Sequence, residues 1–231
     1  MSTISVNTVY QKVLALANKE QRGYITPQEF NLFADQAQQE IFDNYFHDLK
    51  TAQLKSKNDT GYADEIEFLQ EKIAKHISTT SISVSNGYHT LPGDLYSISS
   101  VYISVNGIDR IVERVDDKRL REIISTPLTA PSSIRPVYVE FPGKIKIYST
   151  TTSDAVITYT IRPGAPSWGY IVVSGKALYN NNTSTDFALH VSEENNLVMR
   201  ILQLAGISTE EQFLTSVASQ DAANTEAKKN N

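Results

Sequence analysis

The stretch "ITYTIRPGAPSWGYI", from Ile157 to Ile171, marks the point where one kind of local structure ends and another begins. Its first half alternates apolar and polar side chains, which predicts a β-strand. Pro163 and Pro166 then stop the strand and stiffen a turn that holds Trp168, the only tryptophan of the chain. A large aromatic side chain in such a turn suits a catalytic loop, a ligand platform or a subunit contact, and the rest of the sequence must separate these functions.

Strand patterns continue on the N-terminal side of this stretch, back to about Thr79. Two asparagine–glycine pairs, Asn86–Gly87 and Asn106–Gly107, stand between short runs of alternating apolar residues and predict tight hairpins. A third hairpin is predicted around "PGK" (142–144), and "YIVV" and "KALY" predict two later strands. Several short strands with turn signals between them predict an antiparallel β-sandwich or barrel-like domain over residues 79–189.

Helical periodicity appears on both sides of this β-region. The clearest signal is "ITPQEFNLFADQAQQEIFDNYF", in which Thr26 is the expected cap, Pro27 suits the first helical position, and Glu29 completes a capping box. After His190 another apolar stripe predicts a helix with Ser192 as its cap and Gly206 as its stop.

The fold class expected from these patterns is α+β. Residues 1–78 and 190–231 are predicted to form one discontinuous helical bundle domain, because amphipathic helices must bury their apolar faces against each other. The β-domain over residues 79–189 is predicted to be inserted between the two helical parts.

Composition narrows the function classes. The chain has 231 residues, a formal net charge of −5 and no cysteine. Disulfides, thiolate nucleophiles and cysteine-bound zinc are therefore excluded, and no apolar run reaches the roughly 18 residues of a membrane span. The mild acidity argues against a general nucleic-acid binder, although a local basic rim is compatible with it.

No pattern of catalytic or metal-binding residues stands out. The four histidines (His47, His76, His89 and His190) follow no metal-ligand spacing, and the sequence contains no nucleophile elbow, phosphate-binding loop or dinucleotide fingerprint. Asp43 and His47 lie four residues apart on a predicted helix and could hold a metal or relay a proton, but solvated helix faces carry such pairs routinely. We therefore expect a protein that is not an enzyme and that binds no cofactor.

The twelve tyrosines are more informative, because tyrosine is enriched at protein interfaces and also in the faces of sheets. Pro163 and Pro166 limit the freedom of the backbone around Trp168, so little entropy is lost if this side chain docks. One hypothesis is that Trp168 and Tyr170 contact a neighbouring subunit. The alternative is that Trp168 covers the core of its own domain.

The order of several motifs resembles a known family. A capped helix is followed by "LPGDLYSISSVYI", then by "RPVYVEFPGKIKIYSTTTSDAVITYTIRPGAPSWGYI", and finally by "DFALHVSEENNLVMRILQLAGIS". This order resembles the tail-adaptor or ring proteins, the head-to-tail connectors, of crAss-like and other short-tailed bacteriophages. Pro136 to Tyr138, Tyr159 to Pro163 and Glu194 to Gly206 carry the resemblance, which extends over most of the chain.

The resemblance implies a structural virion protein of the portal–tail vertex, made in the cytoplasm of the bacterial host. Such a protein docks below the portal in a homo-oligomeric ring of about twelve copies, links the portal to the tail, and lines the DNA channel. Its implied partners are the portal protein and the neighbouring tail or ring proteins, with no membrane partner.

The resemblance also suggests interface residues. The expected docking segment is the C-terminal stretch 208–231, with Phe213, Leu214 and Val217. A second candidate interface is the turn that contains Pro163, Pro166, Trp168 and Tyr170. The stretch "DDKRLREII" (116–124) predicts a short helix, and its Lys118, Arg119 and Arg121 are the candidates for contact with DNA phosphate, with a solvated helix face as the alternative.

Two other functions remain open from the sequence. The chain could be another tail module, such as a tail-tube protein or a receptor-binding accessory protein, or it could be a hydrolase or small-ligand domain without a recognisable motif.

Overall fold

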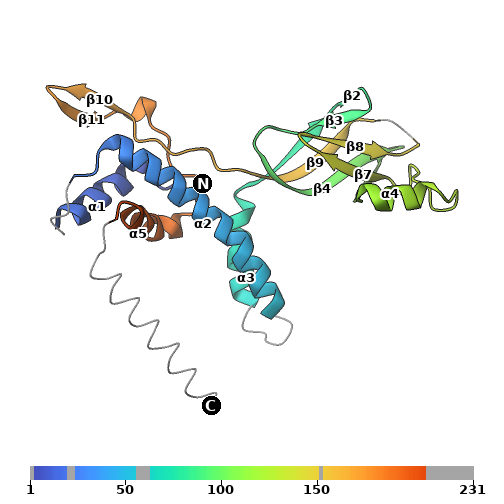
Figure 1. The fold of residues 1–231 in the computed structure, drawn as a ribbon, viewed down its shortest axis with the longest axis horizontal. Coiled ribbons are helices and arrows are strands. Elements are labelled where there is room, and N and C mark those ends of the chain that lie inside the picture. The colour runs from blue at the N-terminus through green and yellow to red at the C-terminus, as the bar shows by residue number, and fades with distance from the viewer. Residues whose placement is uncertain (1–2, 20–23, 56–62, 151–152, 207–231) are drawn as a thin grey trace, which may run out of the picture. The chain divides into compact units, whose positions relative to one another are not determined.

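The structure is a computed structural model that describes residues 3–19, 24–55, 63–150 and 153–206 (Figure 1). The chain divides into two compact units. The terminal unit joins Met1–Lys72 to Pro163–Asn231, and the central unit is the continuous stretch Ile73–Arg162. Within the described ranges the fold is mixed α+β, with five α-helices and several sheets that are mainly antiparallel.

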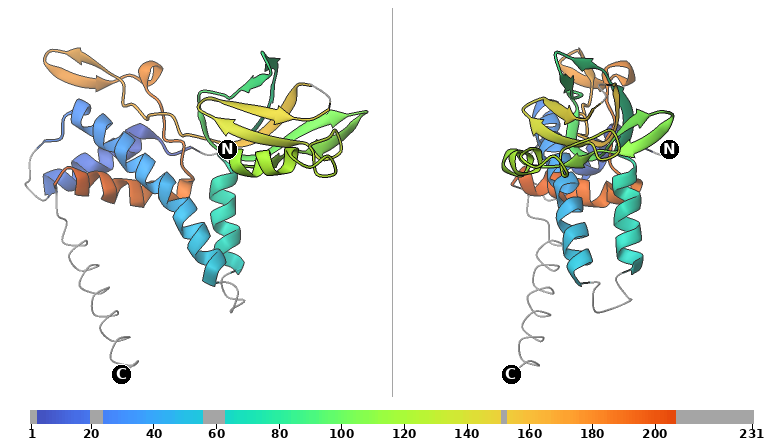
Figure 2. Two further views of the ribbon diagram at one scale, coloured as in Figure 1. Left: turned by 45° about the vertical axis from the view of Figure 1, so that its right-hand side comes forward. Right: turned by 90° about the vertical axis from the view of Figure 1, so that its right-hand side faces the viewer.

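Helices form the body of the terminal unit. They are α1 (Val6–Lys19), α2 (Pro27–Lys55), most of α3 (Ala63–Ala74), and α5 (Glu194–Leu204). Helix α5 packs against both α1 and α2, and the views in Figure 2 place α3 beside the second half of α2. The apolar stripes of α1, α2 and α5 are buried, and they include Val9, Val13, Phe30, Phe42, Leu197, Ile201 and Leu202.

The start of α2 is the capping box that its sequence predicts. The Thr26 amide donates to the Glu29 carboxylate at 2.9 Å, and the Glu29 amide donates to the Thr26 hydroxyl at 3.3 Å. Helix α2 begins at Pro27, whose missing amide hydrogen costs nothing in the first turn. All three predicted roles are confirmed.

The start of α5 differs from the prediction. Ser192 lies inside a short 3₁₀ turn, η3 (Val191–Glu193), and the side chain that caps this turn belongs to His190. The Nδ1 atom of His190 accepts from the Ser192 amide at 3.3 Å. The N-cap of α5 is Glu193, which makes no side-chain cap bond, so the expected cap at Ser192 is wrong by one residue. Gly206 has a φ of 72°, the left-handed conformation expected after the helix.

The segment 163–189 returns to the terminal helices. It contains a hairpin of β10 (Tyr170–Val173) and β11 (Lys176–Tyr179), which forms a two-stranded sheet of its own, and the short 3₁₀ turn η2 (Asn181–Thr183). Fully buried Gln38 of α2 holds the segment at two points, since its Nε2 donates to the Gly164 carbonyl and its Oε1 accepts from the Ala188 amide, both at 2.8 Å. The expected boundary at residue 189 therefore differs from the observed grouping, which places these residues with the helices.

The central unit contains two open sheets. The first has the strand order β1 (Ile77–Ile82), β9 (Ala155–Ile161), β4 (Leu95–Val105) and β5 (Ile108–Ile111). The second has the order β2 (Val84–Ser85), β3 (Tyr88–Thr90), β8 (Lys144–Tyr148), β7 (Val137–Phe141) and β6 (Glu113–Arg114). All pairings are antiparallel except that of β6 with β7, and neither sheet closes into the barrel-like form that the sequence left open.

Side chains from both sheets share one apolar core. Val101, Ile103, Ala155 and Ile157 come from the first sheet, and Tyr138 and Ile145 come from the second. The opposite face of β7 is covered by α4 (Asp117–Ile124), whose Leu120 packs on Val137 and Val139. The strands of the second sheet therefore have two buried faces where α4 lies and one elsewhere.

The turns of the central unit follow the sequence closely. Asn86 and Gly87 have φ values of 50° and 77°, and Asn106 and Gly107 have values of 52° and 78°. These positive values fit the tight hairpins predicted from the two dipeptides, and the predicted hairpin of β7 and β8 is also present. The three hairpins are confirmed.

Candidate functional site

Trp168 lies inside the terminal unit. Only 3% of its surface is exposed. Its indole Nε1 donates to Oδ1 of Asn7 on α1 at 3.0 Å, and its backbone amide donates to Oδ1 of Asn31 on α2 at 2.8 Å. The Asn31 side-chain amide returns a bond to the Trp168 carbonyl at 3.4 Å. Two asparagines on two helices thus satisfy the polar atoms of this turn.

Three tyrosines surround the indole. The ring centroid of Tyr10 lies 4.4 Å from that of Trp168, and the centroids of Tyr170 and Tyr179 lie at 5.8 and 5.7 Å. Tyr170 and Tyr179 are cross-strand partners at the base of the β10–β11 hairpin. Burial raises the pKa of Tyr10, whose hydroxyl donates to the Ile25 carbonyl at 3.2 Å. We call Tyr10, Trp168, Tyr170 and Tyr179 the tryptophan cluster.

Gly169 permits the close approach on which this cluster depends. A Cβ atom at this position would lie 2.2 Å from the Thr183 hydroxyl oxygen and 2.6 Å from the Thr183 backbone. The Gly169 amide donates to the Ser184 hydroxyl at 3.0 Å, and its carbonyl accepts from the Asn180 amide at 2.8 Å. Because the obstacle includes backbone atoms, no other residue fits here without a shift of the chain.

These contacts bear on the two hypotheses for the proline–tryptophan turn. Pro163, Pro166 and Trp168 are buried within their own chain, and Tyr170 is half-buried. The alternative reading of the sequence, in which Trp168 covers the core of its own domain, describes the observed contacts. Phe213, Leu214 and Val217, like the whole segment 208–231, lie outside the described residues.

The β10–β11 hairpin itself carries an exposed apolar face. Ile171, Val173 and Leu178 lie on the face opposite the tyrosine pair, and about half of each side chain is exposed. Two isolated strands are marginally stable in water, so the tryptophan cluster at the base is what holds the hairpin.

A polar groove of about 460 Å³ lies between α2, α3 and α5. Among its lining residues, the Lys72 ammonium and the Glu193 carboxylate are 2.6 Å apart, with only 13% and 4% of their side chains exposed. The second Glu193 oxygen accepts from Asn196 at 2.6 Å. Because both oxygens are occupied, Glu193 serves as a buried ion-pair partner that ties α3 to the start of α5.

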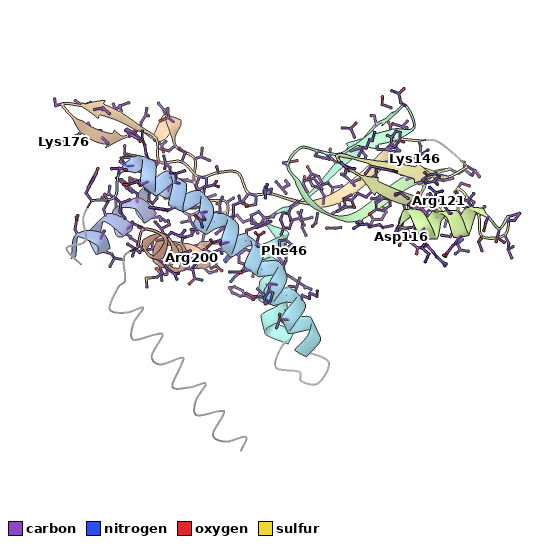
Figure 3. The ribbon with its side chains drawn as sticks, in the orientation of Figure 1. Phe46, Asp116, Arg121, Lys146, Lys176 and Arg200 are labelled. Carbon is purple, nitrogen blue, oxygen red and sulfur yellow. The ribbon has the colours of Figure 1, made fainter. Side chains whose placement is uncertain are left out.

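Tyr45 extends this arrangement. Its hydroxyl is buried and has no partner of hydrogen-bonding geometry among the described residues, and burial together with the negative charge of Glu193 raises its pKa. Lys72 lies 5.4 Å from the Tyr45 ring centroid and 4.4 Å from that of Phe68. Arg200, labelled in Figure 3, forms an ion pair with Glu40 at the rim.

The structure places His47 of the candidate pair Asp43 and His47 at an exposed position of α2, where its Nδ1 lies 3.5 Å from the Asp48 carboxylate. Among the described residues no group of three or more histidine, aspartate or glutamate side chains could hold a metal ion. His89 is buried, with Nε2 at 3.0 Å from the Ser153 carbonyl, and burial lowers the pKa of His76 to about 4.

The basic helix α4 is exposed but largely neutralised. The Arg119 guanidinium lies 3.2 Å from Glu122, and that of Arg121 lies 2.9 Å from Asp117. Lys118 is exposed beside them, and Figure 3 labels Arg121 and the capping residue Asp116 on this helix. Two of the three expected DNA-contact residues are therefore paired with carboxylates of their own helix.

A different basic surface lies on β3 and β8 of the same unit. The Lys144 ammonium is 4.2 Å from the centroid of the Tyr88 ring, and the Lys146 ammonium is 5.6 Å from Tyr88 and 5.0 Å from Tyr148. We call these four residues the lysine–tyrosine face, on which Figure 3 labels Lys146. Our interpretation of the sequence missed it, although the alternation of Lys144, Lys146 and Tyr148 along one strand was a visible signal.

Comparison with known protein families finds no match, and comparison with curated proteins finds no significant relative. Within the described ranges, no helix combines the length and the apolar character that crossing a membrane would require.

Proposed function

We propose that this chain is a structural subunit of a phage particle, a head-to-tail connector that docks below the portal and links it to the tail. In this proposal the terminal unit is the helical body of a ring of about twelve copies, with the β-domain inserted between its two halves. The subunit acts by binding and not by catalysis, and the ring surrounds the DNA channel.

One observation supports the proposal most directly. Two motifs of the resemblance, "LPGD" and "YTIRP", lie more than sixty residues apart in the sequence and meet at Asp94. The Asp94 carbonyl accepts from the Arg162 amide at 2.8 Å, and its carboxylate accepts from the Tyr159 hydroxyl at 3.4 Å. The two motifs are therefore hydrogen-bonded to each other at the end of the central unit. Such a contact is expected of residues that define a family's fold.

The exposed hairpin adds to this support. Contiguous apolar surface outside a core marks interaction sites in many proteins, and Ile171, Val173 and Leu178 on one face of the hairpin are each about half exposed. In an assembly, a subunit could bury such a face against its neighbour.

The test is the number of copies of this protein per copy of portal protein, measured by quantitative mass spectrometry of gradient-purified particles. A ratio near one is expected for a ring in register with the portal. Absence of the protein from the particle would overturn the proposal.

A further inference from the structure

Charge is unevenly divided between the two units. Residues 73–162 carry ten lysines and arginines against eight aspartates and glutamates, whereas the remaining residues carry eleven against eighteen. The central unit therefore has a formal charge of +2 and the remainder −7, within a chain of net charge −5. An asymmetry of this kind points to a polyanionic partner for the basic unit.

Several bases of the central unit are already neutralised within it. Arg114 lies 3.0 Å from Glu140, and Arg119 and Arg121 are paired on α4 as described. The ammonium groups of Lys144 and Lys146 have no carboxylate within 4.0 Å among the described residues. The nearest acidic residue along β7, Glu140, is in register with Ile145 and so lies on the opposite face of the sheet.

The sheet holds these two lysines side by side. Lys144, Lys146 and Tyr148 alternate along β8 and so share one face. His89 of β3 is in register with Ile145, which places Tyr88 opposite Lys146 on that same face. Both ammonium groups lie against the one Tyr88 ring, at 4.2 and 5.6 Å.

Two like charges held against one ring repel each other, and the ring's negative face offsets only part of that repulsion. An anion between them would remove it. Since the tyrosines already restrict the lysine side chains, little side-chain entropy remains to be lost when such an anion binds.

We propose that Lys144 and Lys146 bind the phosphodiester backbone of DNA, with Tyr88 and Tyr148 as the residues that position them. This inference deepens the proposed function and rests on it for the source of the DNA, while the contact itself is a property of the single chain. It also moves the expected phosphate contact from α4 to the lysine–tyrosine face.

The geometry specifies the mode of binding. The ammonium groups occupy the faces of the tyrosine rings, so those faces are not open to unpaired bases. Duplex DNA, which has the higher density of phosphate charge, is therefore the preferred ligand, and binding is independent of base sequence.

The experiment is a fluorescence-anisotropy titration of the full chain with labelled DNA, using a duplex of about 20 base pairs and one of its single strands, between about 20 and 200 mM salt. Each phosphate contact contributes about 0.9 to the slope of log K against log salt concentration. The double variant Lys144→Gln/Lys146→Gln is expected to lower this slope by about 2. The double Lys→Arg variant should keep it.

Two matched controls complete the design. Lys118→Gln on α4 and Lys176→Gln on the β10–β11 hairpin remove one exposed lysine each, and neither should change the slope by as much as one lysine of the lysine–tyrosine face does. Circular dichroism of each variant establishes that it is folded.

Each result decides the matter. No binding by the wild-type chain at the lowest salt concentration, or an unchanged slope in the Lys→Gln double variant, overturns the proposal. Preference for the single strand, lost in Tyr88→Leu but kept in the double Lys→Gln variant, would show a base-stacking surface and overturn it as well. None of these results depends on the copy number in the particle, so this inference and the proposed function can fail separately.

Discussion

The tryptophan cluster of the terminal unit and the lysine–tyrosine face of the central unit use similar side chains in opposite ways. Around Trp168, helices close over the rings, and asparagine side chains satisfy the polar atoms. Around Tyr88, the rings stay at the surface and are covered by lysine side chains. The partners of an aromatic ring, more than the ring itself, therefore decide whether it stabilises its own fold or shapes a surface for another molecule.

The largest expected effect is the loss of the indole. Trp168→Ala removes a buried ring that joins α1, α2 and the hairpin, and should lower the free energy of unfolding by about 3–5 kcal/mol. Urea denaturation followed by circular dichroism measures this change. Trp168→Phe keeps most of the packing and should cost clearly less. A loss below about 1 kcal/mol in Trp168→Ala would show that the cluster does not hold the unit together.

A close second is the substitution Gly169→Ala. The added Cβ meets the Thr183 backbone at 2.6 Å, so the chain must shift, at a cost of up to about 3 kcal/mol. Gly164→Ala is the matched control in the same segment, because no atom lies within 4 Å of its added Cβ. Equal unfolding midpoints for the two variants in urea would contradict the importance of the close approach.

His76 should make the stability of the central unit sensitive to acid. Burial, and to a lesser degree the charge of Lys75, lowers the pKa of His76 from 6.5 to about 4. The unfolded chain therefore binds a proton at a pH where the folded chain does not. This contribution to stability is complete above pH 6.5 and is lost progressively as the pH falls to about 4 and below, by about 3 kcal/mol in total.

Urea unfolding of the wild type and of His76→Gln at about pH 7 and pH 4.5 tests this dependence. The variant should lose less stability between the two conditions than the wild type does. His47→Gln, which changes an exposed histidine of the terminal unit, should behave as the wild type. The same pH dependence in His76→Gln and the wild type would assign the acid sensitivity to other groups.

The smallest stability effect is expected at Tyr88. Tyr88→Leu removes the contacts of exposed Lys144 and half-buried Lys146 with the ring and should lower the free energy of unfolding by less than about 1 kcal/mol. The comparison with Trp168→Ala, measured in the same urea titrations, then separates a ring that stabilises the fold from one that serves a surface. A loss at Tyr88 as large as that at Trp168 would remove the distinction.

The sequence predicts best what is local. The capping box of Thr26 and Glu29 and the turns at Asn86–Gly87 and Asn106–Gly107 each involve residues within four positions of one another, so their patterns are specific. The mixed α+β class follows from the change of hydrophobic period.

Contacts between residues far apart in the chain could not be predicted from the sequence. Asn7 and Asn31 lie 161 and 137 positions from the Trp168 that they bind, and no periodicity links them. Without those partners the sequence could not decide between a subunit contact and a cover for the core of its own domain. The start of α5 shows the same limit on a smaller scale, because Ser192 lies inside a 3₁₀ turn that the helical pattern does not reveal, and the helix begins after Glu193.

Gln38 has a consequence for engineering the chain. Its side chain binds the Gly164 carbonyl and the Ala188 amide, so it fixes both ends of the segment that carries the β10–β11 hairpin. Lengthening a loop whose ends are fixed costs little closure entropy, only about 0.6 kcal/mol for each doubling. The hairpin tip at Ser174–Gly175 is therefore the place to graft an epitope or a probe without disturbing the helices.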